Sequence, residues 1–140
     1  MSRFVVDASV AVKWLVPEIG AEAARRVLRP NHELLAPDLI WAEVGNILWK
    51  KFRRGELAGE TARDLLQDFQ RAPLQIAASQ LLMPAAWNLA EMYERSFYDS
   101  LYLALAVGSE CQLVTADLRL YNRLKTGPLA ERLLWVENTA

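Results

Sequence analysis

Short apolar segments alternate with helical patterns along this chain, and that alternation limits its possible folds more than any other feature. The short apolar segments predict strands at residues 3–6, 33–35, 74–77, 111–114 and 133–136. The intervening segments predict helices at residues 8–16, 22–28, 38–54, 61–71, 81–93, 97–107 and 118–125. Strands that alternate with helices indicate an α/β domain, here with a mostly parallel sheet of about four to five strands.

Several helix boundaries carry explicit signals. Asp38 is a plausible N-cap of the long helix, and Gly55 is its C-terminal signal. The first helix is expected to stop near Pro17, and Pro84 would suit the first turn of the helix that starts near residue 81.

Length and composition favour one folded domain over residues 1–140. The 140 residues are 53% apolar, which argues against a disordered chain. Cys111 is the only cysteine, so an internal disulfide framework is excluded and a reducing cytoplasm is the default expectation. No run reaches about 18 uninterrupted apolar residues, so we expect no membrane span.

Four acidic residues border or interrupt the apolar segments: Asp7, Glu43, Asp99 and Asp117. In parallel α/β folds the active site lies beyond the carboxyl ends of the strands, where Asp7 and Asp117 are both placed. Four converging carboxylates would repel one another, and a divalent cation with oxygen ligands resolves that conflict. The pattern therefore predicts a Mg²⁺ or Mn²⁺ site that hydrolyses phosphodiesters.

Three of these residues also have a local explanation. Asp7 and Asp117 could cap the helices that follow them, and Ser96-x-x-Asp99 resembles a capping box. A carboxylate in the first turn of a helix also gains from the helix dipole, which would keep Asp99 ionised for a cation.

Glu43 lies in a helix that is apolar nearly all round, where it shares a narrow polar stripe with Asn46 and Lys50. The stripe faces either solvent or the site. If it faces the site, Glu43 binds metal, Asn46 orients it or contacts phosphate, and Lys50 reaches toward the substrate. The hydroxyls of Ser9 and Thr115 would support neighbouring carboxylates, or they would satisfy local backbone groups.

Basic residues offer a candidate RNA-binding surface beside the acidic residues. The candidates are Lys50, Lys51, Arg53, Arg54 and Arg119. The formal net charge of −1 argues mildly against indiscriminate nucleic-acid binding. These residues either follow phosphates or form ordinary solvated helix faces.

Four short motifs give the chain a resemblance to the PIN-domain family, and in particular to the VapC-type toxins of prokaryotic toxin–antitoxin pairs. The motifs are Val5-Val6-Asp7-Ala8-Ser9, Glu43-Val44-x-Asn46-x-Leu48, Tyr98-Asp99-x-x-Tyr102-Leu103-Ala104-Leu105-Ala106 and Leu113-Val114-Thr115-Ala116-Asp117. They span residues 3–136, nearly the whole chain, and their order and spacing make the combination specific.

This resemblance implies a three-layer α/β/α domain and a Mg²⁺- or Mn²⁺-dependent endoribonuclease. It implies that Asp7, Glu43, Asp99 and Asp117 form the acidic centre, with Thr115 and Ser9 as supports and Asn46 at a frequent polar position of the family. It further implies RNA as substrate, products with 5′-phosphate and 3′-hydroxyl ends, a homodimer, and a small antitoxin whose tail enters the groove and blocks the site.

Other functions remain open at this point. The fold could serve as a PIN-like scaffold that binds RNA or protein without cutting, and the five Trp residues would suit such an interface. A DNA-directed nuclease or another Mg²⁺-dependent phosphoesterase is a further alternative. Asp7-Ala8-Ser9 lacks the second aspartate of the DxD phosphatase signature, and neither His32 nor Cys111 has the neighbours of a nucleophilic site.

Overall fold

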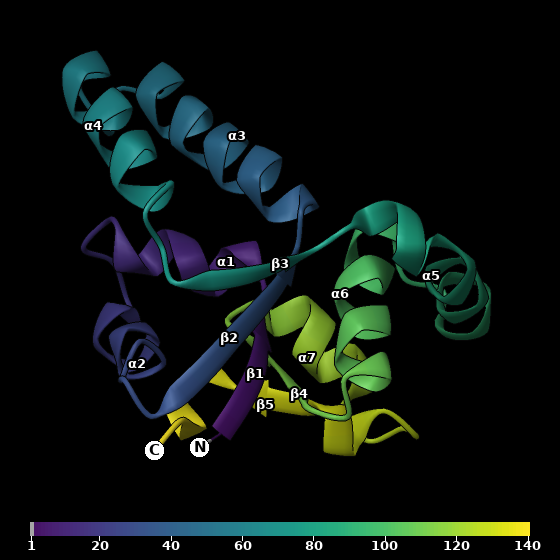
Figure 1. Cartoon of the computed structure of the whole chain (residues 1–140). Coiled ribbons are helices and arrows are strands. Elements are labelled where there is room, and N and C mark those ends of the chain that lie inside the picture. Colours follow the sequence, from purple (N-terminus) through teal and green to yellow (C-terminus); the bar gives the residue numbers. More distant parts are fainter. Residues whose placement is uncertain (1) are drawn as a thin grey trace.

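The computed structural model describes residues 2–140, which build a five-stranded sheet in the order β3-β2-β1-β4-β5 (Figure 1). The strands are β1 (Ser2–Val6), β2 (His32–Pro37), β3 (Leu74–Ala77), β4 (Gln112–Thr115) and β5 (Leu133–Trp135). All four neighbouring pairs run parallel. The predicted parallel α/β fold is therefore confirmed.

Helices connect the strands. The α-helices are α1 (Ala8–Ala11), α2 (Ala21–Arg26), α3 (Leu39–Arg53), α4 (Gly59–Phe69), α5 (Ser79–Tyr93), α6 (Phe97–Gly108) and α7 (Leu118–Leu124), and the 3₁₀ turns are η1 (Val12–Trp14), η2 (Ala130–Arg132) and η3 (Val136–Asn138). Within residues 2–140, no helix combines the length and the apolar character that crossing a membrane requires.

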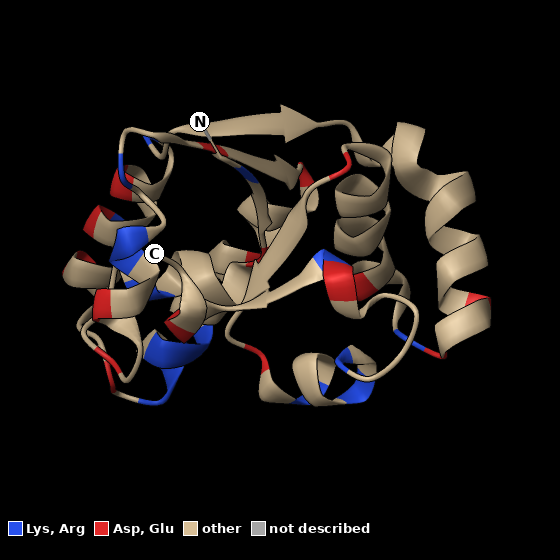
Figure 2. Ribbon diagram, turned by 90° about the horizontal axis from the view of Figure 1, so that it is seen from below, with Lys and Arg blue, Asp and Glu red and all other residues tan. Residues whose placement is uncertain are grey.

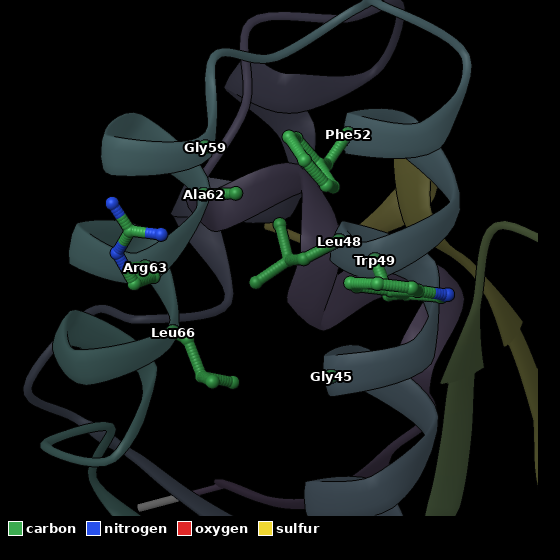
Figure 3. Close-up of a pocket in the computed structure, with 8 residues that line it drawn as sticks. All are labelled: Gly45, Leu48, Trp49, Phe52, Gly59, Ala62, Arg63 and Leu66. Atoms are coloured by element: carbon green, nitrogen blue, oxygen red, sulfur yellow. The ribbon is translucent and has the colours of Figure 1, made fainter.

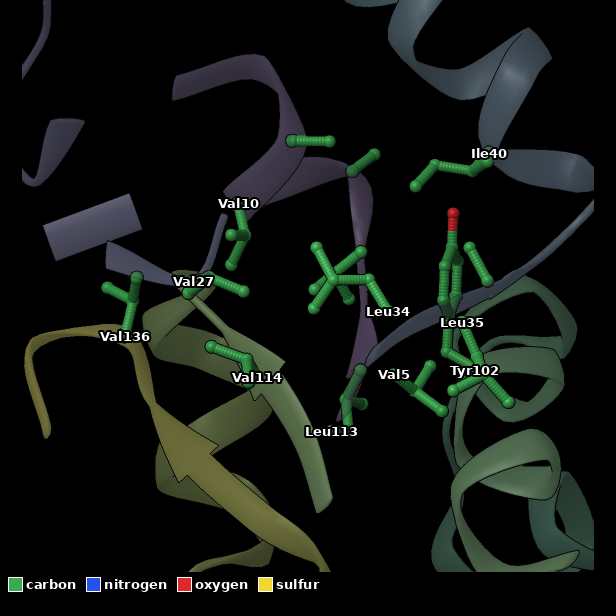
Figure 4. Close-up of a cluster of buried hydrophobic side chains, with 14 of the residues drawn as sticks. Val5, Val10, Val27, Leu34, Leu35, Ile40, Tyr102, Leu113, Val114 and Val136 are labelled. Atoms are coloured by element: carbon green, nitrogen blue, oxygen red, sulfur yellow. The ribbon is translucent and has the colours of Figure 1, made fainter. Parts of the chain in front are cut away.

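The sheet is covered on both faces, which gives the three layers. Helix α6 packs on β1, β2 and β4, and α5 packs along α6. Figure 4 shows Val10 of α1 and Val27 on one side of the strands and Tyr102 of α6 on the other. Val5 and Val6 of the central strand are both fully buried, as expected of a parallel strand that has helices on each face.

Two predicted boundary signals work differently in the structure. Asp38 occupies the N-cap position of α3, but its carboxylate does not cap that helix. Instead it accepts hydrogen bonds from the hydroxyl and, at 3.2 Å, from the backbone N–H of Ser79 at the start of α5. Asp38 is therefore the N-cap residue by position, as predicted, but its carboxylate binds the start of α5, because β2 and β3 end side by side and bring the two helix starts together.

Pro84 lies inside α5 and not in its first turn, because α5 begins at Ser79. Its ring leaves the carbonyl of Gln80 without a helical donor, and both residues are exposed, so water can take that place. The predicted helix at 8–16 is divided into α1 and η1, where the indole N–H of Trp14 donates to the carbonyl of Ala24 at 2.9 Å. Gly55 does end α3, with the left-handed φ of +78° that favours glycine.

Candidate active site

Asp7 and Asp117 lie at the same edge of the sheet, because β1 and β4 are parallel neighbours and each is followed by an acidic residue. Both also cap helices. Asp7 Oδ1 accepts the N–H of Val10 at 3.3 Å. Asp117 Oδ1 accepts the N–H groups of Arg119 at 3.0 Å and Leu120 at 3.2 Å. Asp7 and Asp117 can therefore cap their helices and belong to the site at the same time.

Two hydroxyls hold Asp7 in place. Ser9 Oγ donates to Oδ1 at 2.5 Å, and Thr115 Oγ1 donates to Oδ2 at 2.6 Å. Each hydroxyl in turn accepts a backbone N–H from the segment after β4, from Ala116 at 2.9 Å and Asp117 at 3.0 Å. Since Asp7 is only 7% exposed, this network fixes both of its oxygens in a buried position.

Burial raises the pKa of Asp7 from the ordinary 3.8 to about 6. The hydrogen bonds from Ser9, Thr115 and Val10 oppose the increase, and the negative charge of Asp117 adds to it. A carboxylate in this state gains from a positive charge brought into the site.

Glu43 projects from α3 and accepts a hydrogen bond of 2.6 Å from the hydroxyl of Tyr102 on α6. Burial raises the pKa of Glu43, and the charge of Asp99 raises it further, while the bond from Tyr102 lowers it. The pKa of Tyr102 is raised by burial first and then by Glu43, Asp7 and Asp99. The Tyr102 hydroxyl therefore lies in the combined field of three of the four acidic residues.

Tyr102 lies in the motif of residues 98–106, but the sequence did not predict it to be a residue of the site. The signal was its position three residues after Asp99, which places both on one face of a helix. Figure 4 shows its ring standing between the sheet and α6 with the hydroxyl directed toward the start of α3.

Asp99 lies in the first turn of α6. Its backbone N–H donates to Ser96 Oγ at 3.0 Å, so Ser96 caps the helix as its spacing suggested. The Asp99 carboxylate does not complete a capping box. Its Oδ2 instead accepts a hydrogen bond of 3.0 Å from Nη2 of Arg95, a residue that the sequence had not indicated.

Asn46 and Glu43 line one shallow pocket of about 280 Å³ together with Tyr98, Leu39 and Ala42. Lys50 is exposed and is not part of that lining, so the predicted stripe reaches the pocket only with its first two members.

The basic candidates have different local partners. Lys51 pairs with Glu18 at 3.2 Å and with Glu56 at 3.6 Å, and not with the acidic centre. Arg54 also pairs with Glu56. The guanidinium of Arg53 lies 6.0 Å from the ring centre of Trp49. Arg119 is exposed and adjoins the centre through its backbone bond to Asp117.

The donor set suits a hard divalent cation. Within residues 2–140, no three acidic, His or Cys side chains are close enough to form a ready-made metal cage. Mg²⁺ does not need one, because it keeps several waters and binds through one or two carboxylates. Asp7 with Asp117, and Glu43 with Asp99, are pairs in which one charge raises the partner's pKa, so each pair would gain from a cation.

Comparison with known proteins gives one family. A family model described as "PIN domain" matches residues 4–125. Ribonuclease VapC3 of Pyrobaculum aerophilum is 36% identical over 121 residues, which cover 84% of this chain and 92% of that protein. Ribonuclease VapC9 of Mycobacterium tuberculosis is 34% identical over 116 residues, covering 83% and 87%.

Solved structures show the same fold. PAE2754 from Pyrobaculum aerophilum matches with a TM-score of 0.69 and 25% identity, over 90% of this chain and 82% of that one. VapC20 of Mycobacterium tuberculosis, a toxin that cleaves the sarcin–ricin loop, matches with a TM-score of 0.62 and 17% identity, over 89% and 99%. A toxin–antitoxin complex from Klebsiella pneumoniae matches with a TM-score of 0.66 and 14% identity, over 97% and 98%.

Proposed function

Because this chain belongs to the PIN-domain family, in its VapC-type branch, we propose that it is a metal-dependent endoribonuclease that hydrolyses RNA phosphodiester bonds as the toxin of a toxin–antitoxin pair. The observation that carries the proposal is the buried Asp7 carboxylate, held by two hydroxyls beside Asp117 at the carboxyl edge of the sheet. A buried carboxylate with a raised pKa beside a second carboxylate is typical of a functional site.

Asp7, Glu43, Asp99 and Asp117 would hold one or two Mg²⁺ or Mn²⁺ ions. The bound metal would lower the pKa of a water and offset charge on the scissile phosphate. The chain's own part is to hold the ligands still. Ser9 and Thr115 fix both oxygens of Asp7, and Tyr102 fixes one oxygen of Glu43. Asn46 would contact the substrate from the pocket that it shares with Glu43.

The test uses purified protein that has been freed of any bound partner, a mixed RNA pool, and Mg²⁺ or Mn²⁺. We expect the wild type to cleave RNA, chelation to stop cleavage, and Asp99→Asn to be inactive. Asp68→Asn is the matched control, because Asp68 is an exposed aspartate on α4 that pairs only with Arg71 among the described contacts. Equal cleavage by wild type and Asp99→Asn would contradict the proposal, as would cleavage of DNA or of a simple phosphomonoester but not of RNA.

A groove between α3 and α4 offers a place for an antitoxin (Figure 3). We refer to it as the α3–α4 groove, and it is lined by Gly45, Leu48, Trp49, Phe52, Gly59, Ala62, Arg63 and Leu66. Its volume is about 140 Å³. A Cβ at Gly59 would come within 3.2 Å of the Phe52 ring, so glycine lets that ring lie close against the start of α4. We propose that an apolar side chain of the antitoxin enters here.

The exposed side of α5 offers a surface for a second copy of the chain. By helical geometry Leu81 and Met92 lie on one flank of this exposed surface and Met83 and Trp87 on the other, and all four are between 49% and 83% exposed. Glu91 is the only charged residue in the helix, and Figure 2 shows α5 at the right almost free of charged residues. Glu91 lies within this surface, where it accepts a hydrogen bond from the indole N–H of Trp87. A face with a single charge per copy can meet its own copy with little opposition between like charges. We therefore propose that the homodimer forms through α5.

A further inference from the structure

Arg95 is the cation that touches the acidic centre. It lies in the short connection between α5 and α6, directly after Glu94, whose φ of 52° is left-handed. Its Nη2 is 3.0 Å from Asp99 Oδ2, and the two side chains are only 17% and 28% exposed. Of the ion pairs found among residues 2–140, this is the one that includes an acidic-centre carboxylate.

At this position the guanidinium of Arg95 does not form all of its possible hydrogen bonds. Its Nε–H is buried and has no hydrogen-bond partner among the described residues. A buried donor without an acceptor is unfavourable, and a half-buried ion pair is a weak stabilising device compared with an apolar residue of similar size. Packing stability therefore does not account for an arginine here, whereas the negative charge of Asp99 does.

The charges around Asp99 explain the attraction. Asp99 and Glu43 lie near enough for one to act on the other, and Tyr102 contributes no positive charge. In the absence of a metal ion, Arg95 supplies the positive charge that this side of the acidic centre lacks. A divalent cation bound there would meet the same carboxylate and would be repelled by the guanidinium.

We propose that Arg95 is a positioning residue that acts as a built-in counter-ion: it holds Asp99 while the site is empty and competes with the divalent cation for that carboxylate. The inference rests on the proposed function, since it assumes that Asp99 is a metal ligand. It predicts that Arg95 weakens the affinity of the centre for metal and raises the metal concentration at which the enzyme becomes active.

The test measures Mn²⁺ binding to the full-length protein without RNA, from the free-ion signal in electron paramagnetic resonance. Arg95→Met should bind Mn²⁺ about fivefold more tightly than the wild type, which corresponds to about 1 kcal/mol. Arg95→Gln, which keeps a donor but loses the charge, serves as the second variant if Arg95→Met does not fold. Arg95→Lys should return most of the way to wild-type affinity.

Arg123→Met is the matched control, because Arg123 pairs with Glu94 at 3.6 Å, is 57% exposed, and carries the same charge close by in the chain's fold. Its Mn²⁺ affinity should equal that of the wild type. Unchanged or weaker affinity in a folded Arg95→Met or Arg95→Gln protein would overturn the proposal, since a merely structural role would lower the melting temperature without tightening metal binding.

RNA cleavage at increasing Mn²⁺ separates this inference from the proposed function. The Mn²⁺ concentration for half-maximal cleavage should fall about fivefold in Arg95→Met, with similar rates at saturation. Cleavage by both proteins with equal Mn²⁺ dependence would refute the role of Arg95 alone. No Mn²⁺ binding and no cleavage by either protein would refute the metal nuclease itself, and the Arg95 proposal with it.

Discussion

Tyr102 and Glu43 are 59 positions apart in the sequence, yet the Tyr102 hydroxyl donates a 2.6 Å hydrogen bond to Glu43 Oε1. This bond joins α6 to α3. The hydroxyl is buried, and the charges of Asp7 and Asp99 also raise its pKa. It therefore interacts with residues from three separate segments of the chain. Orientation of Glu43 thus depends on a side chain that has no charge of its own.

Tyr102→Phe removes that bond and leaves Glu43 without its donor. Loss of a partner to a metal ligand lowers activity by about tenfold or more. Because the bond lowers the pKa of Glu43, its loss should raise that pKa and move the acid limb of the pH–rate profile to higher pH. Tyr121→Phe is the control, since Tyr121 packs on Trp135 away from Glu43. A Tyr102→Phe profile that overlays the wild type would argue against a role for this bond.

Asp7→Asn should abolish cleavage and, in the metal-free protein, should gain stability relative to the wild type as pH rises from about 4 to 6. The folded-state pKa of about 6 lies above the ordinary 3.8, so the folded protein binds more protons than the unfolded chain between these values. Wild-type stability therefore falls as pH rises from about 4 to 6, by at most about 3 kcal/mol. A neutral amide does not titrate, so its advantage over the wild type should grow across this range and then level off.

The measurement is urea unfolding of both proteins at pH 4, 5, 6 and 8 with a chelator present. Saturating Mn²⁺ should reverse the order at pH 8, because metal stabilises only the protein that binds it. A constant difference between the two proteins at all four pH values would show that Asp7 does not titrate in this window.

Thr115→Val deletes a hydroxyl that donates to Asp7 and accepts from the backbone of Asp117. Both partners would be left unsatisfied, which should destabilise the protein by about 2 kcal/mol and lower cleavage. Thr115→Ser should restore both. Ser100→Ala removes another fully buried hydroxyl, but one that has no hydrogen-bond partner within residues 2–140, so thermal unfolding should show almost no change. Equal losses for Thr115→Val and Ser100→Ala would point to packing and not to the hydrogen bonds.

Ala62→Phe should fill the α3–α4 groove and weaken binding of the antitoxin by tenfold or more, in an order-of-magnitude estimate for a lost anchor pocket. RNA cleavage should stay unchanged because the groove residues make no contact with Asp7 or Asp117 among the described hydrogen bonds. Co-purification with a co-expressed candidate antitoxin measures the effect. Ala78→Phe, an exposed alanine outside the groove, is the control. Undiminished capture by Ala62→Phe would place the antitoxin elsewhere.

Trp87→Glu adds a second carboxylate beside Glu91 on the exposed face of α5, where Trp87 is 61% exposed and its indole N–H donates to Glu91. Two such charges would oppose each other in a symmetric contact, so the protein should change from dimer to monomer in light scattering. Ile19→Glu alters an even more exposed apolar residue that is not on α5 and should leave the mass unchanged. A wild type that is monomeric at high concentration would remove the basis for the α5 interface.

The order of strands and helices could be predicted because each element has its own apolar pattern, and all five predicted strands occur within one or two residues of their expected bounds. Asp7 and Asp117 could be placed at one edge because parallel topology brings strand ends together. Contacts between residues that are far apart in the sequence could not be predicted. Lys51 belongs to a basic run in the sequence, but in the structure it forms an ion pair with Glu18, which lies 33 residues earlier.

Arg95 and Tyr102 show the same limit within the site. Arg95 follows a helix C-terminus, where a basic residue is unremarkable, and only the turn at Glu94 brings its side chain to Asp99. In the sequence Tyr102 resembles the other apolar residues of a buried helix, and only the packing of α3 brings Glu43 to its hydroxyl. Local patterns define the elements, whereas these two contacts depend on how the elements meet.

The central place of β1 has a consequence during synthesis. Asp7 is made 108 residues before Thr115, whose hydroxyl holds its Oδ2 and whose strand, β4, pairs with β1. A chain still on the ribosome, or one released early, therefore has its first acidic residue without the neighbour that orders it. Until residues up to Asp117 have emerged and β4 has paired with β1, the unfinished polypeptide lacks the ordered pair of carboxylates at the edge of the sheet.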